Sequence, residues 1–125
     1  MDREEIQQMR RSYSERELNL PNDPIAAFKI WLKEAAEYPA IVEANAMVLS
    51  TNGEELTSRS VLLKDVTESG FSFFTNYNSR KARGIEINPQ VSLLFPWYPM
   101  ERQVIVLGTA EKISREESEK YFATR

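Results

Sequence analysis

The sequence predicts a mainly β fold with flanking helices (α+β), in which one antiparallel sheet closes into a small barrel. From residue 44 onward, short runs rich in β-branched and aromatic residues alternate with turn signals, which is typical of strands. Five such runs follow one another with tight turns, which favours antiparallel pairing and closure of the sheet. Helical patterns occur before the first run, after the third and after the fifth.

Two helices are predicted before the strands. Residues 3–14 form a polar helical pattern with a thin apolar stripe, which the proline and asparagines of 18–22 end. Asp23 offers an N-cap and Pro24 suits the first helical position, so a second helix begins there and ends near Tyr38. Its apolar residues recur at helical spacing and predict that it covers a hydrophobic face: Ile25, Phe28, Trp31, Leu32 and Ala35.

The remaining elements follow from the same signals. The five strands are predicted over residues 46–51, 56–66, 71–76, 90–97 and 102–113. Asn52-Gly53 is a hairpin signal between the first two strands, and residues 68–70 serve the same purpose between the next two. A short helix is expected over 78–86, and a last one begins at Ser114, which has capping-box spacing to Glu117.

The chain length of 125 residues, with 42% hydrophobic residues, predicts one compact domain. We expect a helical lid segment over 1–20 and the barrel domain over 21–125. The last helix is cut at Arg125, so we expect the natural domain to continue. The charged start of the chain and the lack of any run of about 20 apolar residues favour a cytoplasmic protein without a membrane span.

The composition limits the chemistry. Because the chain has no cysteine, disulfides, thiolate nucleophiles and thiolate metal sites are excluded. It also has no histidine, so the commonest general base and metal ligand are missing and we expect no metal site. A net charge of −3 argues mildly against nucleic acid as a partner. Any chemistry must use carboxylates, Lys, Arg, Tyr, hydroxyls or a cofactor.

The most informative segment is 73–82, in which a strand leads through a turn into a helix that begins with Ser79, Arg80 and Lys81. A helix start presents unpaired amides and a positive dipole end, so these side chains form a plausible phosphate cradle. The alternative is a solvated helix start, although cations are slightly unfavourable there. The residues alone leave both interpretations open.

A second candidate is the strand 58–65, whose apolar centre lies between Arg59 and Lys64. In a regular strand these two side chains point to opposite faces, because an odd number of positions separates them. They can serve one ligand group only if a bulge intervenes; otherwise two ligands are bound. The alternative, charges at the two ends of a strand, is favoured by the residues alone.

Two weaker candidates lie elsewhere. The aromatic connection 95–104 carries prolines that exclude it from a central strand, and it offers Trp97 for core capping or subunit contact and Gln103 as an amide for a ring edge. Basic and phenolic groups occur together at both ends of the chain and suit a phosphorylated aromatic ligand, although such groups are usually solvent-facing: Arg10, Arg11, Ser12, Tyr13, Tyr121 and Arg125.

Together, these segments resemble the pyridoxamine 5'-phosphate oxidase family along nearly the whole chain. The stretches that carry the resemblance are Met9-Arg10-Arg11-Ser12-Tyr13, Asp23-Pro24, Glu43-Ala44-Asn45-Ala46-Met47, Arg59-Ser60-Val61-Leu62-Leu63-Lys64, Phe74-Thr75-Asn76, Ser79-Arg80-Lys81, Asn88-Pro89, Ser92-Leu93-Leu94-Phe95, Glu101-Arg102-Gln103-Val104 and Tyr121-Phe122. So many matches in order are specific, whereas a single Ser-Arg-Lys is not.

The resemblance implies an FMN-binding split β-barrel, usually a homodimer with FMN at the subunit interface. It implies that FMN contacts fall on Arg59, Ser60, Val61, Leu62, Leu63, Lys64, Phe74, Thr75, Arg80, Lys81 and Gln103. It implies that substrate contacts fall on Arg10, Arg11, Ser12, Tyr13, Lys64, Tyr121 and Arg125. On this assignment Arg59 serves the flavin and Lys64 the substrate, so two ligands account for their odd spacing.

The implied reaction oxidises the C4' amine or alcohol of pyridoxamine or pyridoxine 5'-phosphate to the aldehyde of pyridoxal 5'-phosphate, with hydride passing to flavin N5 and then to oxygen. Family members continue well past the end of this chain into further FMN contacts and an Arg-Leu-His element. The alternatives are therefore a non-catalytic module that binds FMN or pyridoxal phosphate, and a fragment with little activity.

Overall fold

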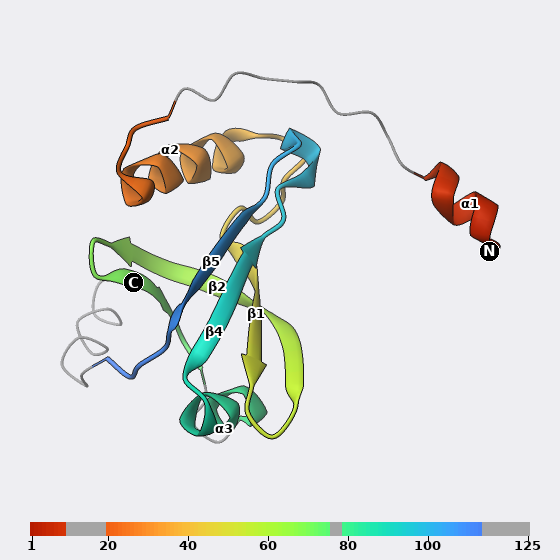
Figure 1. Ribbon diagram of the computed structural model, residues 1–125. Coiled ribbons are helices and arrows are strands. Elements are labelled where there is room, and N and C mark those ends of the chain that lie inside the picture. The colour runs from red at the N-terminus through yellow and green to blue at the C-terminus, as the bar shows by residue number, and fades with distance from the viewer. Residues whose placement is uncertain (10–19, 76–78, 114–125) are drawn as a thin grey trace.

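The computed structural model describes residues 1–9, 20–75 and 79–113 of the chain (Figure 1). Its elements are α1 (Arg3–Gln8), α2 (Pro24–Glu37), β1 (Ala46–Asn52), β2 (Leu56–Thr67), β3 (Gly70–Phe73), α3 (Arg80–Ile87), β4 (Gln90–Phe95), the 3-10 helix η1 (Tyr98–Met100) and β5 (Val104–Thr109). In the part of the chain that the structure describes, no helix is long and apolar enough to cross a membrane.

Both predicted helices before the sheet are present, but α1 ends at Gln8, with Met9 as its C-cap, earlier than the predicted pattern. In α1 the Asp2 carboxylate accepts a hydrogen bond from the Glu5 amide at 2.9 Å; the predicted continuation over residues 10–14 lies outside the described residues. In α2 the Asp23 carboxylate accepts from the Ile25 amide at 3.0 Å, and Pro24 occupies the first helical position. The helix ends before Tyr38, whose extended backbone is the conformation that a following proline favours.

The five strands form one antiparallel sheet with the order β3-β2-β1-β4-β5, so the expected antiparallel split-barrel architecture is confirmed. Three strands are shorter than predicted. β3 ends at Phe73, and β4 ends at Phe95 because Pro96 has no amide hydrogen to donate to a ladder. β5 spans only Val104–Thr109, because η1 and the left-handed backbone of Glu101 precede it.

The inner face of the sheet carries the core. Met47, Leu49 and Thr51 alternate inward along β1, and Leu93 and Phe95 do so along β4. Helix α2 covers this face near the start of β1, where the Phe28 ring lies 4.9 Å from both the Phe71 and Phe95 rings (Figure 1). The core is therefore closed at the α2 end by aromatic contacts.

Trp97 caps this core. Its side chain is 2% exposed, and its indole N–H donates to the Ala44 carbonyl at 3.0 Å. The predicted core-capping role is therefore confirmed for Trp97, whereas the neighbouring Tyr98 is 57% exposed. A buried indole needs such a hydrogen bond, because an unpaired N–H in an apolar environment is costly.

The outer face of the sheet carries an apolar group beside a row of serines, and no described element covers it. Cross-strand pairing places Leu62 beside Ala46, Val48 beside Leu94, and Leu94 beside Ile105. Exposed fractions are 37% for Leu62, 59% for Ile105 and 77% for Leu107. We call this surface the outer apolar face; it consists of Val48, Leu62, Leu94, Ile105 and Leu107.

Candidate functional site

The start of α3 is built by local hydrogen bonds. The Ser79 hydroxyl accepts from the Ala82 amide at 3.2 Å and so forms the N-cap, and it lies 3.2 Å from the Thr75 hydroxyl. Arg80 and Lys81 occupy the first two helical positions, the former exposed and the latter half-buried. The predicted arrangement of a strand, a turn and a cationic helix start is thus present, with residues 76–78 outside the described residues.

Two glycines position α3 against the β1–β2 hairpin. A Cβ atom on Gly53 would lie 2.6 Å from the Gly84 Cα atom, so the hairpin and the helix are in backbone contact. A Cβ on Gly84 would lie 3.3 Å from the Thr51 hydroxyl, which is itself buried and 3.3 Å from the Thr57 hydroxyl. The hairpin therefore determines where the start of α3 lies.

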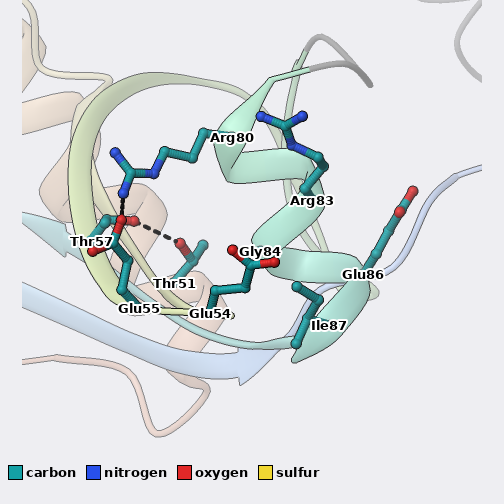
Figure 2. A pocket seen from close by; sticks show the side chains of 9 residues that line it. All are labelled: Thr51, Glu54, Glu55, Thr57, Arg80, Arg83, Gly84, Glu86 and Ile87. Carbon is teal, nitrogen blue, oxygen red and sulfur yellow. Dashed lines mark hydrogen bonds and ion pairs between the residues drawn. The ribbon is translucent and has the colours of Figure 1, made fainter.

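Between the hairpin and α3 lies a cavity of about 530 Å³, which we call the α3 hollow (Figure 2). Its lining residues are Thr51, Glu54, Glu55, Thr57, Arg80, Arg83, Gly84, Glu86 and Ile87. Arg80 reaches across it and forms an ion pair with Glu55, whereas Arg83 turns away from that hairpin residue (Figure 2). The side chains of Arg80 and Glu55 are 67% and 59% exposed.

Arg59 lies next to the hollow, on the inner face of β2. One guanidinium nitrogen donates to the Leu49 carbonyl at 3.0 Å, and another donates to the Thr57 hydroxyl. Burial lowers the pKa of Arg59, because a desolvated guanidinium loses hydration of its charged form. Thr57 therefore links Arg59 to the hollow, because it accepts a hydrogen bond from Arg59 and lines the same hollow as Arg80.

The rest of the stretch from Arg59 to Lys64 divides between the two faces. Val61 packs against the core and Leu63 is buried within it, whereas Ser60 and Leu62 are exposed on the outer face. The pairing of β2 with β3 shifts register between Leu63 and Asp65, so Lys64 lies at an irregularity. Strict alternation does not hold across it, and the odd spacing from Arg59 no longer requires opposite faces.

Gln103 lies at the other end of the sheet from α3. It precedes β5 and is exposed; the next residue, Val104, pairs with Phe95 at the α2 end of the sheet. Helix α3 instead lies beside the β1–β2 hairpin, at the opposite end (Figure 1). A single chain therefore does not bring Gln103 together with Arg80.

The other predicted residues divide into two groups. Phe74 and Thr75 are half-buried and follow β3 in the segment that leads to α3, so they lie on the α3 side of the candidate site. Lys64 is the one predicted substrate contact within the described ranges, because the remaining ones lie outside the described residues: Arg10, Arg11, Ser12, Tyr13, Tyr121 and Arg125.

The sequence did not single out Thr51, Glu55, Thr57 or Gly84, which surround the cationic helix start. A signal was present in Thr51, a polar residue at an inward position of an alternating strand. No local pattern indicates Glu55 or Gly84, because their contacts join segments about 25 or more positions apart along the chain.

Comparison with known proteins identifies the relatives. A family model described as pyridoxamine 5'-phosphate oxidase matches residues 32–125. A pyridoxine/pyridoxamine 5'-phosphate oxidase of Prochlorococcus marinus is 50% identical over 98% of this chain and 56% of its own length. One of Escherichia coli is 46% identical over 99% of this chain and 60% of its own. The chain thus spans a little over half the length of these relatives.

Solved structures show the same fold. PhzG from Burkholderia lata, in complex with tetrahydrophenazine-1-carboxylic acid, has a TM-score of 0.77 and 27% identity, over 84% of this chain and 52% of that one. A pyridoxamine 5'-phosphate oxidase-related, FMN-binding protein from Nostoc punctiforme has a TM-score of 0.62 and 16% identity, over 81% of this chain and 55% of that one. Because the family model matches residues 32–125, the chain belongs to the pyridoxamine 5'-phosphate oxidase family.

Proposed function

We propose that this chain binds FMN and forms part of an oxidase that converts pyridoxamine or pyridoxine 5'-phosphate to pyridoxal 5'-phosphate. The observation that carries the proposal is the cationic start of α3 beside the half-buried Arg59, in a chain of this family. We propose a cytoplasmic location, as expected from the sequence.

The residues present fit the phosphate of FMN. The α3 start combines a positive dipole end and unpaired amides with the guanidinium of Arg80 and the ammonium of Lys81. Thr75 and Ser79 add hydroxyl groups at the same point. This set suits a dianion better than a neutral ligand, because each group donates a hydrogen bond or carries positive charge.

Bound FMN supplies hydride acceptance and reoxidation by oxygen, which no side chain of this composition can supply. The protein's own contribution is to bind and orient. Arg59 holds its place through the Leu49 carbonyl and the Thr57 hydroxyl, so its remaining donors are preorganised beside α3. Lys64 binds the phosphate of the B6 substrate in this proposal, with Arg10 to Tyr13, Tyr121 and Arg125 completing that site.

A homodimer with FMN at the subunit interface accounts for two observations. The outer apolar face is uncovered by any described element, and such a patch is typical of a contact surface. Gln103 and Arg80 lie at opposite ends of one sheet, so a flavin that touches both needs a second copy to supply one of them. Pairing two sheets would bring the opposite ends of different subunits together.

A second function is a binding module that holds FMN or pyridoxal phosphate without turnover. This function is favoured by the observation that the chain matches just over half the length of its oxidase relatives. A third outcome is a fragment with little activity. The binding module keeps the site without oxidising the substrate, whereas the fragment binds no ligand tightly.

The first test is a visible absorption spectrum of the purified chain after FMN is added and the sample is desalted. A flavin band near one equivalent supports the proposal, and loss of the band contradicts FMN binding by this chain. Peroxide release on addition of pyridoxine 5'-phosphate then separates the oxidase from the binding module, because only turnover reduces oxygen.

A further inference from the structure

Arg80 is ion-paired with Glu55, although the proposed flavin site needs the charge of Arg80 to bind the phosphate. Arg80 is the first residue of α3, where its charge opposes the positive end of the helix dipole. An anion close to Arg80 relieves this conflict. In the structure that anion is the Glu55 carboxylate, which comes from the β1–β2 hairpin.

Glu55 is held near α3 by the backbone. Gly53, two residues earlier, contacts Gly84 so closely that a Cβ atom would lie 2.6 Å from the Gly84 Cα. The hairpin therefore cannot move away from the helix without breaking this contact. Glu55 accordingly stays within reach of Arg80.

The hairpin side of the α3 hollow carries the negative charge that a second anion meets. Two carboxylates, Glu54 and Glu55, line it there beside the guanidinium groups of Arg80 and Arg83. The third carboxylate of the lining, Glu86, is paired with the Lys112 ammonium at 3.4 Å. A phosphate dianion approaching Arg80 must therefore displace Glu55 and overcome its repulsion.

We propose that Glu55 is an internal competitor for Arg80 that sets the affinity of the chain for the phosphate group of its flavin. The proposal rests on the proposed function, in which Arg80 binds that phosphate. In this proposal Arg80 pairs with Glu55 when no phosphate is bound and exchanges it for the phosphate when the flavin binds. Loss of the Glu55 charge then strengthens phosphate binding, the opposite of what loss of a contact residue does.

The test compares FMN with riboflavin, which lacks the phosphate, by titration of flavin fluorescence. Glu55→Gln should tighten FMN binding about two- to tenfold, the size expected from an exposed ion pair plus repulsion, and leave riboflavin binding unchanged. Glu54→Gln is the matched control, since it removes the same charge from the neighbouring position of the same hollow. It should change the FMN affinity less.

Arg80→Ala separates the two proposals. It should weaken FMN binding, and Glu55→Gln should have no further effect in the Arg80→Ala background. If Arg80→Ala weakens FMN but Glu55→Gln does not tighten it, or Glu54→Gln acts equally, the competitor role is wrong and the flavin site stands. If Arg80→Ala leaves FMN affinity unchanged, the proposed phosphate contact is wrong. If neither the unmodified chain nor Glu55→Gln binds FMN at millimolar concentration, both proposals are wrong.

Discussion

At the scale of single residues, the site combines cations with different surroundings. Arg59 is half-buried and bonded to a backbone carbonyl, so its geometry is set before any ligand binds. Arg80 is exposed and paired with the Glu55 carboxylate, so in the proposed site it exchanges this partner for the phosphate. Lys64 lies at a register irregularity of β2. These surroundings suggest that the three cations contribute differently to binding.

The first prediction separates the two ligands. Arg80→Ala should weaken FMN binding by about 1.5–3 kcal/mol, or roughly tenfold to a hundredfold, because a hydrogen bond to a charged group is lost. Lys64→Ala should mainly weaken binding of pyridoxal 5'-phosphate by a similar factor. Isothermal titration of each variant with each ligand measures both effects. Identical losses for both ligands in both variants would contradict the assignment of two phosphates to two cations.

The second prediction concerns Trp97. Trp97→Ala should lower the free energy of unfolding by about 3–5 kcal/mol, since it empties a fully buried position. Trp97→Phe should cost about 1–3 kcal/mol, because the Ala44 carbonyl loses its indole donor. Urea denaturation measures both, with Tyr98→Ala as the exposed neighbour that should change stability by less than about 0.5 kcal/mol. Equal losses of unfolding free energy in Trp97→Ala and Tyr98→Ala would contradict the core-capping role of Trp97.

At the scale of elements, the β1–β2 hairpin and α3 act as one unit. Glycine is required at position 53 because a Cβ atom there would overlap the Gly84 backbone. Its φ angle is not left-handed, so backbone conformation is not the reason. Thr51 and Thr57 complete the contact from the two strands of the hairpin. The helix start that carries Arg80 and Lys81 is therefore positioned by a hairpin about 25 residues earlier in the chain.

The third prediction tests this contact. Gly53→Ala should destabilise the fold by about 1–3 kcal/mol, because the new methyl group overlaps the Gly84 backbone. It should also weaken FMN binding by displacing the α3 start. Gly108→Ala is the matched control in β5, where a Cβ atom meets nothing within 4 Å. Thermal unfolding and FMN titration of both variants provide the readouts. Equal stability and equal FMN affinity of the Gly53→Ala and Gly108→Ala proteins would contradict the role of the hairpin contact in positioning α3.

Much of this architecture follows from local patterns. The β-rich runs predicted all five strands, and Asp23-Pro24 marked the start of α2 where the structure has it. The helix expected over 78–86 is present as Arg80–Ile87, with Ser79 as its N-cap. The strand ends were less accurate, because η1 and the bent backbone at Glu101 depend on tertiary packing. The hollow was beyond prediction, since a glycine contact and an ion pair between distant segments leave no periodic signal.

At the scale of the whole molecule, the sheet has one packed face and one face that none of the described elements covers. The inner face holds the core and α2, whereas the outer apolar face presents leucine and isoleucine side chains to solvent. Monomeric proteins rarely expose a large contiguous apolar patch, so this face indicates a contact surface. In the proposed homodimer a second copy of the chain covers this face, and the same copy supplies Gln103 to the site.

The last prediction tests that dimer. Leu107→Glu places a charge on the outer apolar face, at a side chain that is 77% exposed, so the monomer fold should survive. The dimer should dissociate at micromolar concentration, because an interface core tolerates an unpaired charge poorly. Thr109→Glu is the control, two residues further along the same face at a polar position that pairs with Gln90. Light scattering reports the mass: a monomeric unmodified chain, or a Leu107→Glu protein that remains dimeric, would assign this face another role.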